Sequence, residues 1–145
     1  DGRYKDNFIK SLRENKVIDK VTFFDQVSVD EIPTYVSKAD CLFLSLQNKD
    51  IFSKTVPAKL QSYMALKKPI LAVIDGEGAD LIKISQCGFV ETDSNYQNLV
   101  SLVKKVSEMS NKDLIKLSEN GRNFYDLNFR SSNRKKQLLN LISQS

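Results

Sequence analysis

Apolar side chains recur along most of the chain at intervals of three and four residues, the spacing of one face of an α-helix. On this basis we expect seven helices. Proline and glycine place some of their ends: Pro57 begins the third helix, and Gly88 ends the fourth. The apolar faces of the seven helices are marked by Phe8, Ile9 and Leu12; Ile32, Tyr35 and Val36; Leu60, Tyr63 and Met64; Leu81 and Ile82; Leu99, Leu102, Val103 and Val106; Leu114, Leu117, Phe124 and Leu127; and Leu138, Leu139 and Ile142.

Four short runs of β-branched, aromatic or uninterrupted apolar residues predict strands between these helices. They are residues 21–24, 41–45, 70–74 and 88–92. Strands that alternate with helices are typical of the α/β class, with a parallel sheet and helices on both faces. Four strands are few for such a sheet. We therefore expect residues 1–145 to form a single domain that is a fragment of a longer chain, with another strand just before Asp1.

Composition limits the chemistry. The 145 residues include 22 basic and 18 acidic side chains, a net charge of +4, and 41% are hydrophobic, as in an ordinary globular domain. The absence of histidine excludes a Ser-His-Asp triad, a Cys-His pair and a zinc site built on imidazole. Cys41 and Cys87 stand apart near apolar runs, so we interpret them as reduced core thiols of a cytoplasmic protein.

The positive charge is concentrated near the end of the chain. From Lys104 onward there are nine basic and four acidic residues, a net +5, against 13 basic and 14 acidic residues before it, a net −1. Arg130, Arg134, Lys135 and Lys136 give the last predicted helices a basic character. Three interpretations remain open: a solvated surface, peripheral contact with an anionic membrane surface, or a nucleic-acid site. Because no nucleic-acid-binding motif is present, we expect no nucleic-acid partner.

Ligands of open parallel sheets bind outside the carboxyl ends of the strands. This rule selects the loops 25–28, 46–56 and 75–78. The middle loop leads into the helix that begins at Pro57, and a helix start offers free N–H groups and a partial positive charge to a phosphate. Lys54 and Lys59 flank that start and together would neutralise a diphosphate, although two of 22 basic residues also lie there by chance in many sequences.

The loop formed by Asp75, Gly76, Glu77 and Gly78 is equally consistent with a phosphate contact and with a tight strand-to-helix turn. A glycine pair is only half of the known phosphate-loop patterns. A metal interpretation is weaker still, because the chain's aspartates lack the spacing of a metal site. They fit helix caps and turns better, so we expect no metal.

The sequence, most clearly between Val21 and Pro69, resembles the donor domain of group 1 glycosyltransferases. These enzymes form glycosyltransferase family 4 and have the GT-B fold. The most specific match is 56–65 followed by 68–72, which contains Pro57, Lys59, Leu60, Tyr63, Met64 and Ala65, then Lys68, Pro69 and Ile70. Residues 21–28, Ile32, Pro33, Tyr35, Ala39, Asp40, 118–122 and Phe129 also fit. The resemblance covers essentially the whole chain.

The resemblance implies a Rossmann-like nucleotide-sugar-binding domain that faces an N-terminal acceptor domain, which would lie before Asp1. It assigns the nucleotide base to Gln26, Val27 and Ser28. It assigns the diphosphate to Lys54, Thr55, Val56 and Lys59, with Lys54 and Lys59 as the catalytic residues. Asp75, Gly76, Glu77 and Gly78 would form the donor-sugar loop.

The chain departs from the family pattern at the ribose site. Many members have a Glu, seven intervening residues and a second Glu that binds the ribose hydroxyls, and here Ser53 and Gln61 take these positions. An amide both donates and accepts hydrogen bonds but carries no charge. Gln61, with Lys59 two residues before it, is similar to bacterial surface-polysaccharide transferases that use UDP-activated N-acetylated aminosugars.

The resemblance further implies transfer with retention at the anomeric carbon, from a UDP-sugar to a polysaccharide or lipid-linked acceptor, with no cofactor. The reaction would take place in the cytoplasm or at the inner face of the membrane, and the isolated fragment would be inactive. Two alternatives remain: a receiver-like signalling module, and a UDP-aminosugar epimerase of similar fold. A receiver module needs an acidic pair near its first strand, and this sequence has none there. The epimerase is expected to use a histidine, and the sequence contains no histidine.

Overall fold

The computed structural model describes residues 4–46, 53–92 and 96–143. The chain divides into two compact units, Asp1–Ser37 and Lys38–Ser145. Two predicted helices, marked by Phe8, Ile9 and Leu12 and by Ile32, Tyr35 and Val36, lie in the first unit together with the predicted strand 21–24. All other predicted elements lie in the second unit.

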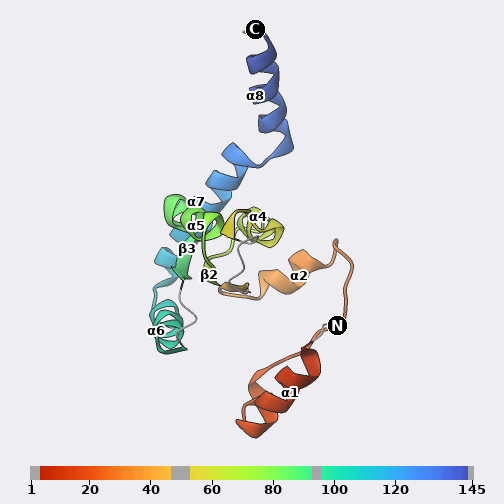
Figure 1. Cartoon of the computed structure of the whole chain (residues 1–145), viewed down its shortest axis with the longest axis vertical. Helices are drawn as coiled ribbons and strands as arrows, with labels where there is room; N and C mark the ends of the chain where they lie inside the picture. The colour runs from red at the N-terminus through yellow and green to blue at the C-terminus, as the bar shows by residue number, and fades with distance from the viewer. Residues whose placement is uncertain (1–3, 47–52, 93–95, 144–145) are drawn as a thin grey trace. The chain divides into compact units, whose positions relative to one another are not determined.

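The first unit contains helices α1 (Lys5–Glu14) and α2 (Ile32–Ser37), with a 3₁₀ turn η1 (Ile18–Lys20) after α1 (Figure 1). The segment that joins η1 to α2 packs through aromatic rings. Phe23 lies edge-on to Phe8 of α1, with ring centroids 6.2 Å apart, and Phe24 lies edge-on to Tyr35 of α2 at 4.8 Å. Such edge-to-face pairs are favoured by the ring quadrupoles.

The predicted strand 21–24 is wrong. The structure assigns no strand within residues 4–37, and Phe23 and Phe24 are 40% and 62% exposed. A run of β-branched and aromatic residues indicates only that a segment suits a pleated surface. A strand also needs a partner backbone, and in this unit the two phenylalanines contact helical aromatic residues instead.

The second unit is built on a parallel sheet of strands β1 (Leu42–Ser45), β2 (Ile70–Val73) and β3 (Gly88–Glu91), in the order β1-β2-β3. Leu42 pairs with Ile70, and Ile70 with Gly88. These strands confirm the predictions for 41–45, 70–74 and 88–92 and the parallel arrangement. All four residues of β2, the central strand, are buried, which explains its uninterrupted apolar sequence.

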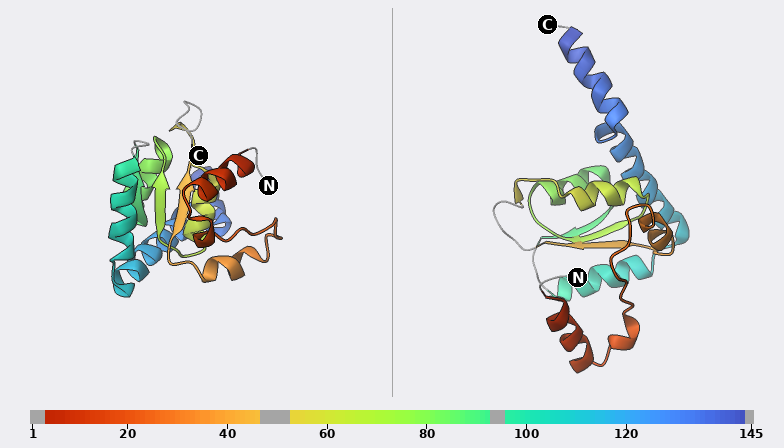
Figure 2. Two further views of the ribbon diagram at one scale, coloured as in Figure 1. Left: turned by 90° about the horizontal axis from the view of Figure 1, so that it is seen from below. Right: turned by 90° about the vertical axis from the view of Figure 1, so that its right-hand side faces the viewer.

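Five described helices accompany the sheet: α4 (Ala58–Ala65), α5 (Glu77–Ser85), α6 (Tyr96–Ser107), α7 (Asn111–Asn128) and α8 (Ser131–Ser143). Helices α4 and α5 lie on one face of the sheet and α6 on the other (Figure 2). Helix α7 packs on α4 and contacts α5. The structure thus confirms an α/β, Rossmann-like fold with a helical C-terminal segment.

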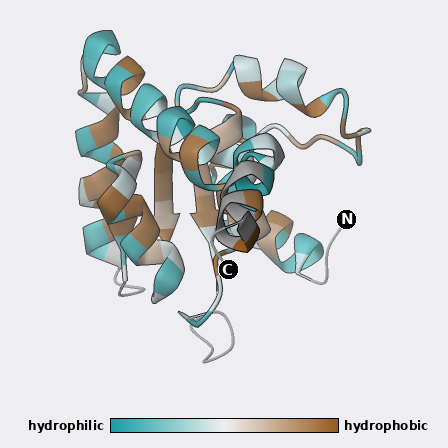
Figure 3. Cartoon of the chain, turned by 90° about the horizontal axis from the view of Figure 1, so that it is seen from above, coloured by the Kyte–Doolittle hydropathy of each residue, from teal (hydrophilic) through white to brown (hydrophobic). Residues whose placement is uncertain are grey.

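The core lies between the sheet and the α4–α5 layer, where hydrophobic strand residues are enclosed by helices (Figure 3). The centre of the core is completely buried, and α7 approaches Cys87 closely there. A methyl group added at Gly121 of α7 would lie 2.9 Å from Cβ of Cys87. Cys87 and Cys41 are both free thiols, buried and half-buried respectively. The buried members of the core are Leu44, Leu60, Met64, Ile70, Ala72, Ile74, Ala79, Ile82 and Cys87.

The prediction that Gly88 ends the fourth helix is wrong. Helix α5 ends at Ser85, and Gln86 takes the left-handed conformation of the cap, with φ of 50°. Gly88 instead begins β3, where an added Cβ would clash with the carbonyl oxygen of Ile70 and lie 2.6 Å from its carbon. The glycine is required by the close approach of β3 to β2.

Candidate functional site

The starts of α4 and α5 lie at the same edge of the sheet. The parallel strands continue their pairing past their last residues: the Leu46 N–H after β1 donates to Val73 O of β2 at 3.1 Å, and the Ile74 N–H after β2 donates to Glu91 O of β3 at 3.1 Å. Helix α4 follows β1 and α5 follows β2, so both begin beyond the carboxyl ends of the strands. This is the edge where open α/β sheets bind ligands.

Residues 53–57, which we call the entry segment, lead into α4. Pro57 is the N-cap, with φ of −60° and ψ of 133°, and its side chain makes no capping hydrogen bond. Proline has no N–H, and the Leu60 N–H donates to Pro57 O at 3.0 Å. The Ala58 and Lys59 N–H groups, which begin the helix, have no intrahelical partner because no preceding turn exists.

The start of α4 is positively charged. Its first turn contains no acidic residue. Lys54 and Lys59 are both exposed, and within the described part of the chain neither forms an ion pair. These ammonium groups add to the partial positive charge of the helix start, so an anion is favoured here.

Buried apolar residues fix this polar segment to the core. Leu60, next to Lys59, is completely buried, and Val56 packs half-buried against the core. Thr55 is exposed, whereas Ser53 and Gln61 are half-buried. The structure therefore places the predicted diphosphate and ribose residues, from Ser53 to Gln61, along one continuous segment whose position is set by its apolar members.

The start of α5 has the opposite charge. Gly76 is its N-cap and donates its N–H to Asp75 Oδ1 at 2.7 Å, and the first turn carries Glu77 and Asp80. Asp80 Oδ1 lies 3.6 Å from Lys83 Nζ, and the Glu77 side chain is exposed. Carboxylates at a helix start neutralise its partial positive charge, so this start suits hydroxyl groups better than a phosphate.

The two helix starts are in contact through glycine backbone. A Cβ added at Gly76 would clash with the carbonyl oxygen of Ser53 and lie 2.6 Å from its Cα, and one added at Gly78 would lie 3.1 Å from Pro57 Cδ. The structure thus brings the predicted donor-sugar loop, Asp75, Gly76, Glu77 and Gly78, against the predicted diphosphate residues. Sequence reasoning missed this contact, because more than 20 residues separate its partners.

The predicted base-binding residues Gln26, Val27 and Ser28 lie in the first unit, before α2. Ser28 donates both its N–H and its hydroxyl to Glu31 Oε2, at 3.0 and 2.7 Å. These two bonds lower the pKa of Glu31. The N–H bond to a carboxylate three residues later is one half of a capping box, and the base-binding role of Gln26, Val27 and Ser28 stays a prediction.

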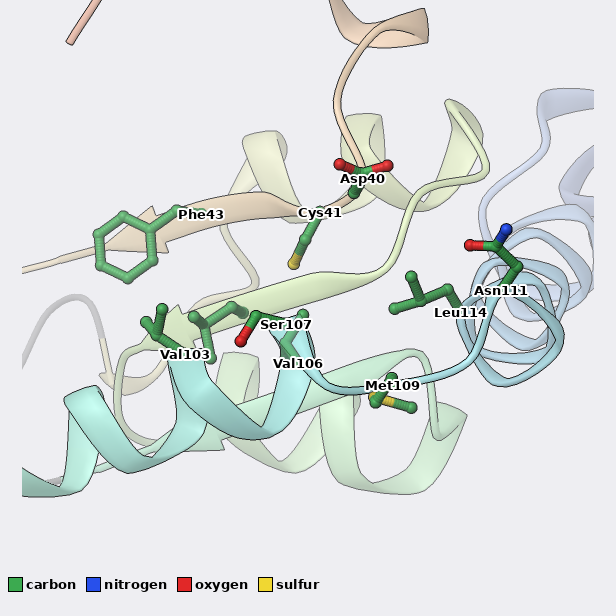
Figure 4. A pocket seen from close by; sticks show the side chains of 10 residues that line it. Asp40, Cys41, Phe43, Val103, Val106, Ser107, Met109, Asn111 and Leu114 are labelled. Carbon is green, nitrogen blue, oxygen red and sulfur yellow. The ribbon is translucent and has the colours of Figure 1, made fainter. Parts of the chain in front are cut away.

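Sequence reasoning also missed an apolar groove of about 590 Å³ on the sheet face that α6 covers in part. Phe43, Leu71, Val103 and Leu114 are among the residues that line it, and the Cys41 thiol lies at its wall (Figure 4). Burial raises the pKa of Cys41, which keeps the thiol protonated at neutral pH. The groove lies on the face of the sheet opposite α4 and α5, so it is distinct from the helix starts.

Two further observations concern ions and membranes. Among the described residues, no group of three or more cysteine or acidic side chains has the arrangement of a metal site. No described helix combines the length and the apolar composition that crossing a bilayer requires.

A Rossmann-like sheet with a cationic helix start at its carboxyl edge is an arrangement at which many α/β domains bind phosphorylated ligands. The family model for glycosyl transferases group 1 matches residues 1–124. The chain belongs to the group 1 glycosyltransferases, and this membership excludes a receiver-like module. Searches of curated proteins and of solved structures found no match.

Proposed function

We propose that this chain is the donor-binding domain of a retaining glycosyltransferase of family 4, which transfers a sugar from a UDP-sugar to a polysaccharide or lipid-linked acceptor. The observation that carries the proposal is the uncapped, cationic start of α4 at the carboxyl edge of the sheet, in a chain that belongs to the group 1 glycosyltransferases. The acceptor is proposed to bind to an N-terminal domain, with the reaction in the cleft between the two domains of a GT-B fold.

The diphosphate is proposed to lie at the start of α4. Lys54 and Lys59 would neutralise its charge, and the N–H groups at the helix start would donate hydrogen bonds to its oxygens. During transfer, negative charge grows on the leaving phosphate as the glycosidic bond to the sugar breaks. Fixed positive groups at that position stabilise the transition state more than the ground state. Such electrostatic stabilisation is the largest contribution to the rate enhancement of many enzymes.

The remaining parts of the donor are assigned by their chemistry. The acidic start of α5, with Glu77 exposed, would accept hydrogen bonds from the sugar hydroxyls. Gln61 and Ser53 would hold the ribose, and Gln26, Val27 and Ser28 the base. The sugar is proposed to be an N-acetylated aminosugar, because Gln61 with Lys59 two residues before it is similar to bacterial surface-polysaccharide transferases that use such sugars.

The proposed reaction needs no metal and no cofactor. A phosphate oxygen of the departing UDP would take the proton from the acceptor hydroxyl as that hydroxyl attacks the anomeric carbon. The new bond forms on the face that the diphosphate leaves, so configuration is retained. Lys54 and Lys59 perform the charge stabilisation that a metal performs in other transferases.

The basic residues of the C-terminal helices support a further part of the proposal. Arg130, Arg134 and Lys135 are exposed, and contact with the anionic inner face of the membrane would bring the active site to a lipid-linked acceptor. The reaction is accordingly placed in the cytoplasm or at that membrane surface. The 145-residue chain without its acceptor domain is expected to be inactive.

NMR titration of the 145-residue chain with UDP, GDP and ADP tests the site. We expect weak binding that favours UDP, with amide shifts at the start of α4. Shifts confined to the C-terminal helices, or no shifts with any of the three nucleotides, would contradict the proposed site.

A further inference from the structure

The contact between the two helix starts depends on residues that have no side chain. Gly76 has φ of 66° and ψ of −145°, a conformation that essentially only glycine adopts. Its backbone lies directly against the backbone of Ser53, so no side-chain movement makes room for a Cβ there. The start of α5 is therefore held against the entry segment by direct backbone packing.

Gly78, two residues further along the chain, makes a second and looser contact. A Cβ at this position would lie 2.9 Å from Ile74 Cδ1 and 3.1 Å from Pro57 Cδ. Gly78 is buried in the first turn of α5, and Pro57 is the N-cap of α4. This glycine thus sets the distance between the first turn of one helix and the cap of the other.

The two helix starts have complementary charge. The start of α4 carries Lys59 and no acid, whereas that of α5 carries Glu77 and Asp80. A sugar diphosphate has the same division, with an anionic part and a neutral part rich in hydroxyls. One such ligand contacts both starts only while they remain at their present separation.

We propose that Gly76 and Gly78 are positioning residues, which hold the starts of α4 and α5 at the separation that one nucleotide-sugar spans. This inference rests on the proposed function and adds to it. The glycines act through the backbone of Ser53 and the ring of Pro57, and they touch neither the ligand nor the reacting atoms in this role.

Gly78 gives a test with an internal control. The probe is UDP-N-acetylglucosamine, because a nucleotide-sugar reaches both helix starts whereas UDP reaches only that of α4. In the 145-residue chain, Gly78→Ala is expected to weaken binding of this probe by about tenfold, because displacement of a binding group by a fraction of an ångström has effects of this order. Ile74→Val removes the Cδ1 atom nearest to the new methyl group but leaves Pro57 Cδ, 3.1 Å away. The double variant Ile74→Val with Gly78→Ala should therefore stay weakened, and Ile74→Val alone should bind the probe as the parent chain does.

The NMR spectrum distinguishes positioning from general destabilisation. In the parent chain UDP-N-acetylglucosamine should shift amides at both helix starts. In folded Gly78→Ala it should shift those of α4 and leave those of α5 almost unchanged. Gly76→Ala should show the same pattern more strongly, and if this variant does not fold, the Gly78 series alone decides.

The outcomes separate the two proposals. A parent chain that binds no nucleotide refutes the proposed function. A parent chain that binds UDP, together with a folded Gly78→Ala variant that binds the nucleotide-sugar as the parent does or still shifts both helix starts with it, overturns the positioning role alone. Full recovery of affinity in the double variant also overturns it, because the loss would then come from Ile74 and not from Pro57.

Discussion

Arg122 of α7 holds the C-terminal end of α4 by a hydrogen bond of 2.8 Å from Nη1 to the carbonyl oxygen of Ala65, the last residue of that helix. Its Nε donates to Asp126 Oδ2, also at 2.8 Å. Carbonyl groups at a helix end lack intrahelical partners and carry partial negative charge, so a guanidinium group there satisfies both. The opposite end of this short helix is the candidate diphosphate site.

Replacing Arg122 should therefore destabilise the second unit. We expect Arg122→Leu to lower the free energy of unfolding by about 1–2 kcal/mol, since it removes a charged donor from a helix end in a partly exposed position. Urea denaturation measures this change. Arg130→Leu is the matched control, because Arg130 contacts the same Asp126 carboxylate at 3.3 Å and is 56% exposed. An equal loss in both variants would contradict the capping role.

The same cluster predicts a pH dependence. The hydrogen bond from Arg122 lowers the pKa of Asp126 in the folded chain. A lowered carboxyl pKa stabilises the fold at pH values above the unfolded pKa, and this contribution is lost as the pH falls through the folded pKa. The stability difference between the parent chain and Asp126→Asn should therefore be constant near neutrality and shrink in acid. A difference that grows on acidification would contradict this assignment.

Lys59 should be important for turnover. In the full-length enzyme we expect Lys59→Ala to reduce kcat by about 100-fold, the usual effect of removing one group that stabilises charge in the transition state. Lys112, an exposed lysine in the first turn of α7, provides the control Lys112→Ala, which should leave the rate unchanged. Equal rates in the parent and Lys59→Ala enzymes would remove Lys59 from the diphosphate role.

Neighbouring residues of β1 should respond differently to truncation. Leu44 is 3% exposed and faces the core, whereas Phe43 is 51% exposed and lines the groove on the other face. Leu44→Ala should cost about 3 kcal/mol, because it leaves a cavity in packed surroundings. Phe43→Ala should cost about 1 kcal/mol or less, because its ring is half solvated. Denaturant titration gives both values, and a larger loss at Phe43 would mean that its ring is packed in solution.

Much of the second unit was predictable because its signals are local. Residues 70–73 are apolar without interruption and form the central strand. Pro57 lies at the N-cap position of α4, at the start of the helix, where proline is common. The rule that ligands bind at the carboxyl edge selected the loops 25–28, 46–56 and 75–78. The described residues 53–56 and the 75–78 loop lie at that edge, whereas the choice of 25–28 depended on the strand 21–24, which the structure does not contain.

The errors share one physical cause, which is that their outcomes depend on distant backbone. Residues 21–24 have strand composition, but their phenylalanines pack on Phe8 and Tyr35, and no described residue of that unit pairs with them as a strand. Gly88 was predicted to cap a helix, yet its role is set by Ile70 on the neighbouring strand. A glycine serves either purpose equally well, and only its surroundings distinguish the two.

The sequence by itself thus determined the alternating strands and helices, the cationic start of α4 and the resemblance to group 1 glycosyltransferases, because each depends on residues close together in the chain. Only the tertiary structure decided that Gly76 packs on Ser53 and Gly78 on Pro57, and so that the two helix starts form one surface. Such contacts arise when separate segments are brought together by the burial of a shared core, and no local pattern encodes their distance.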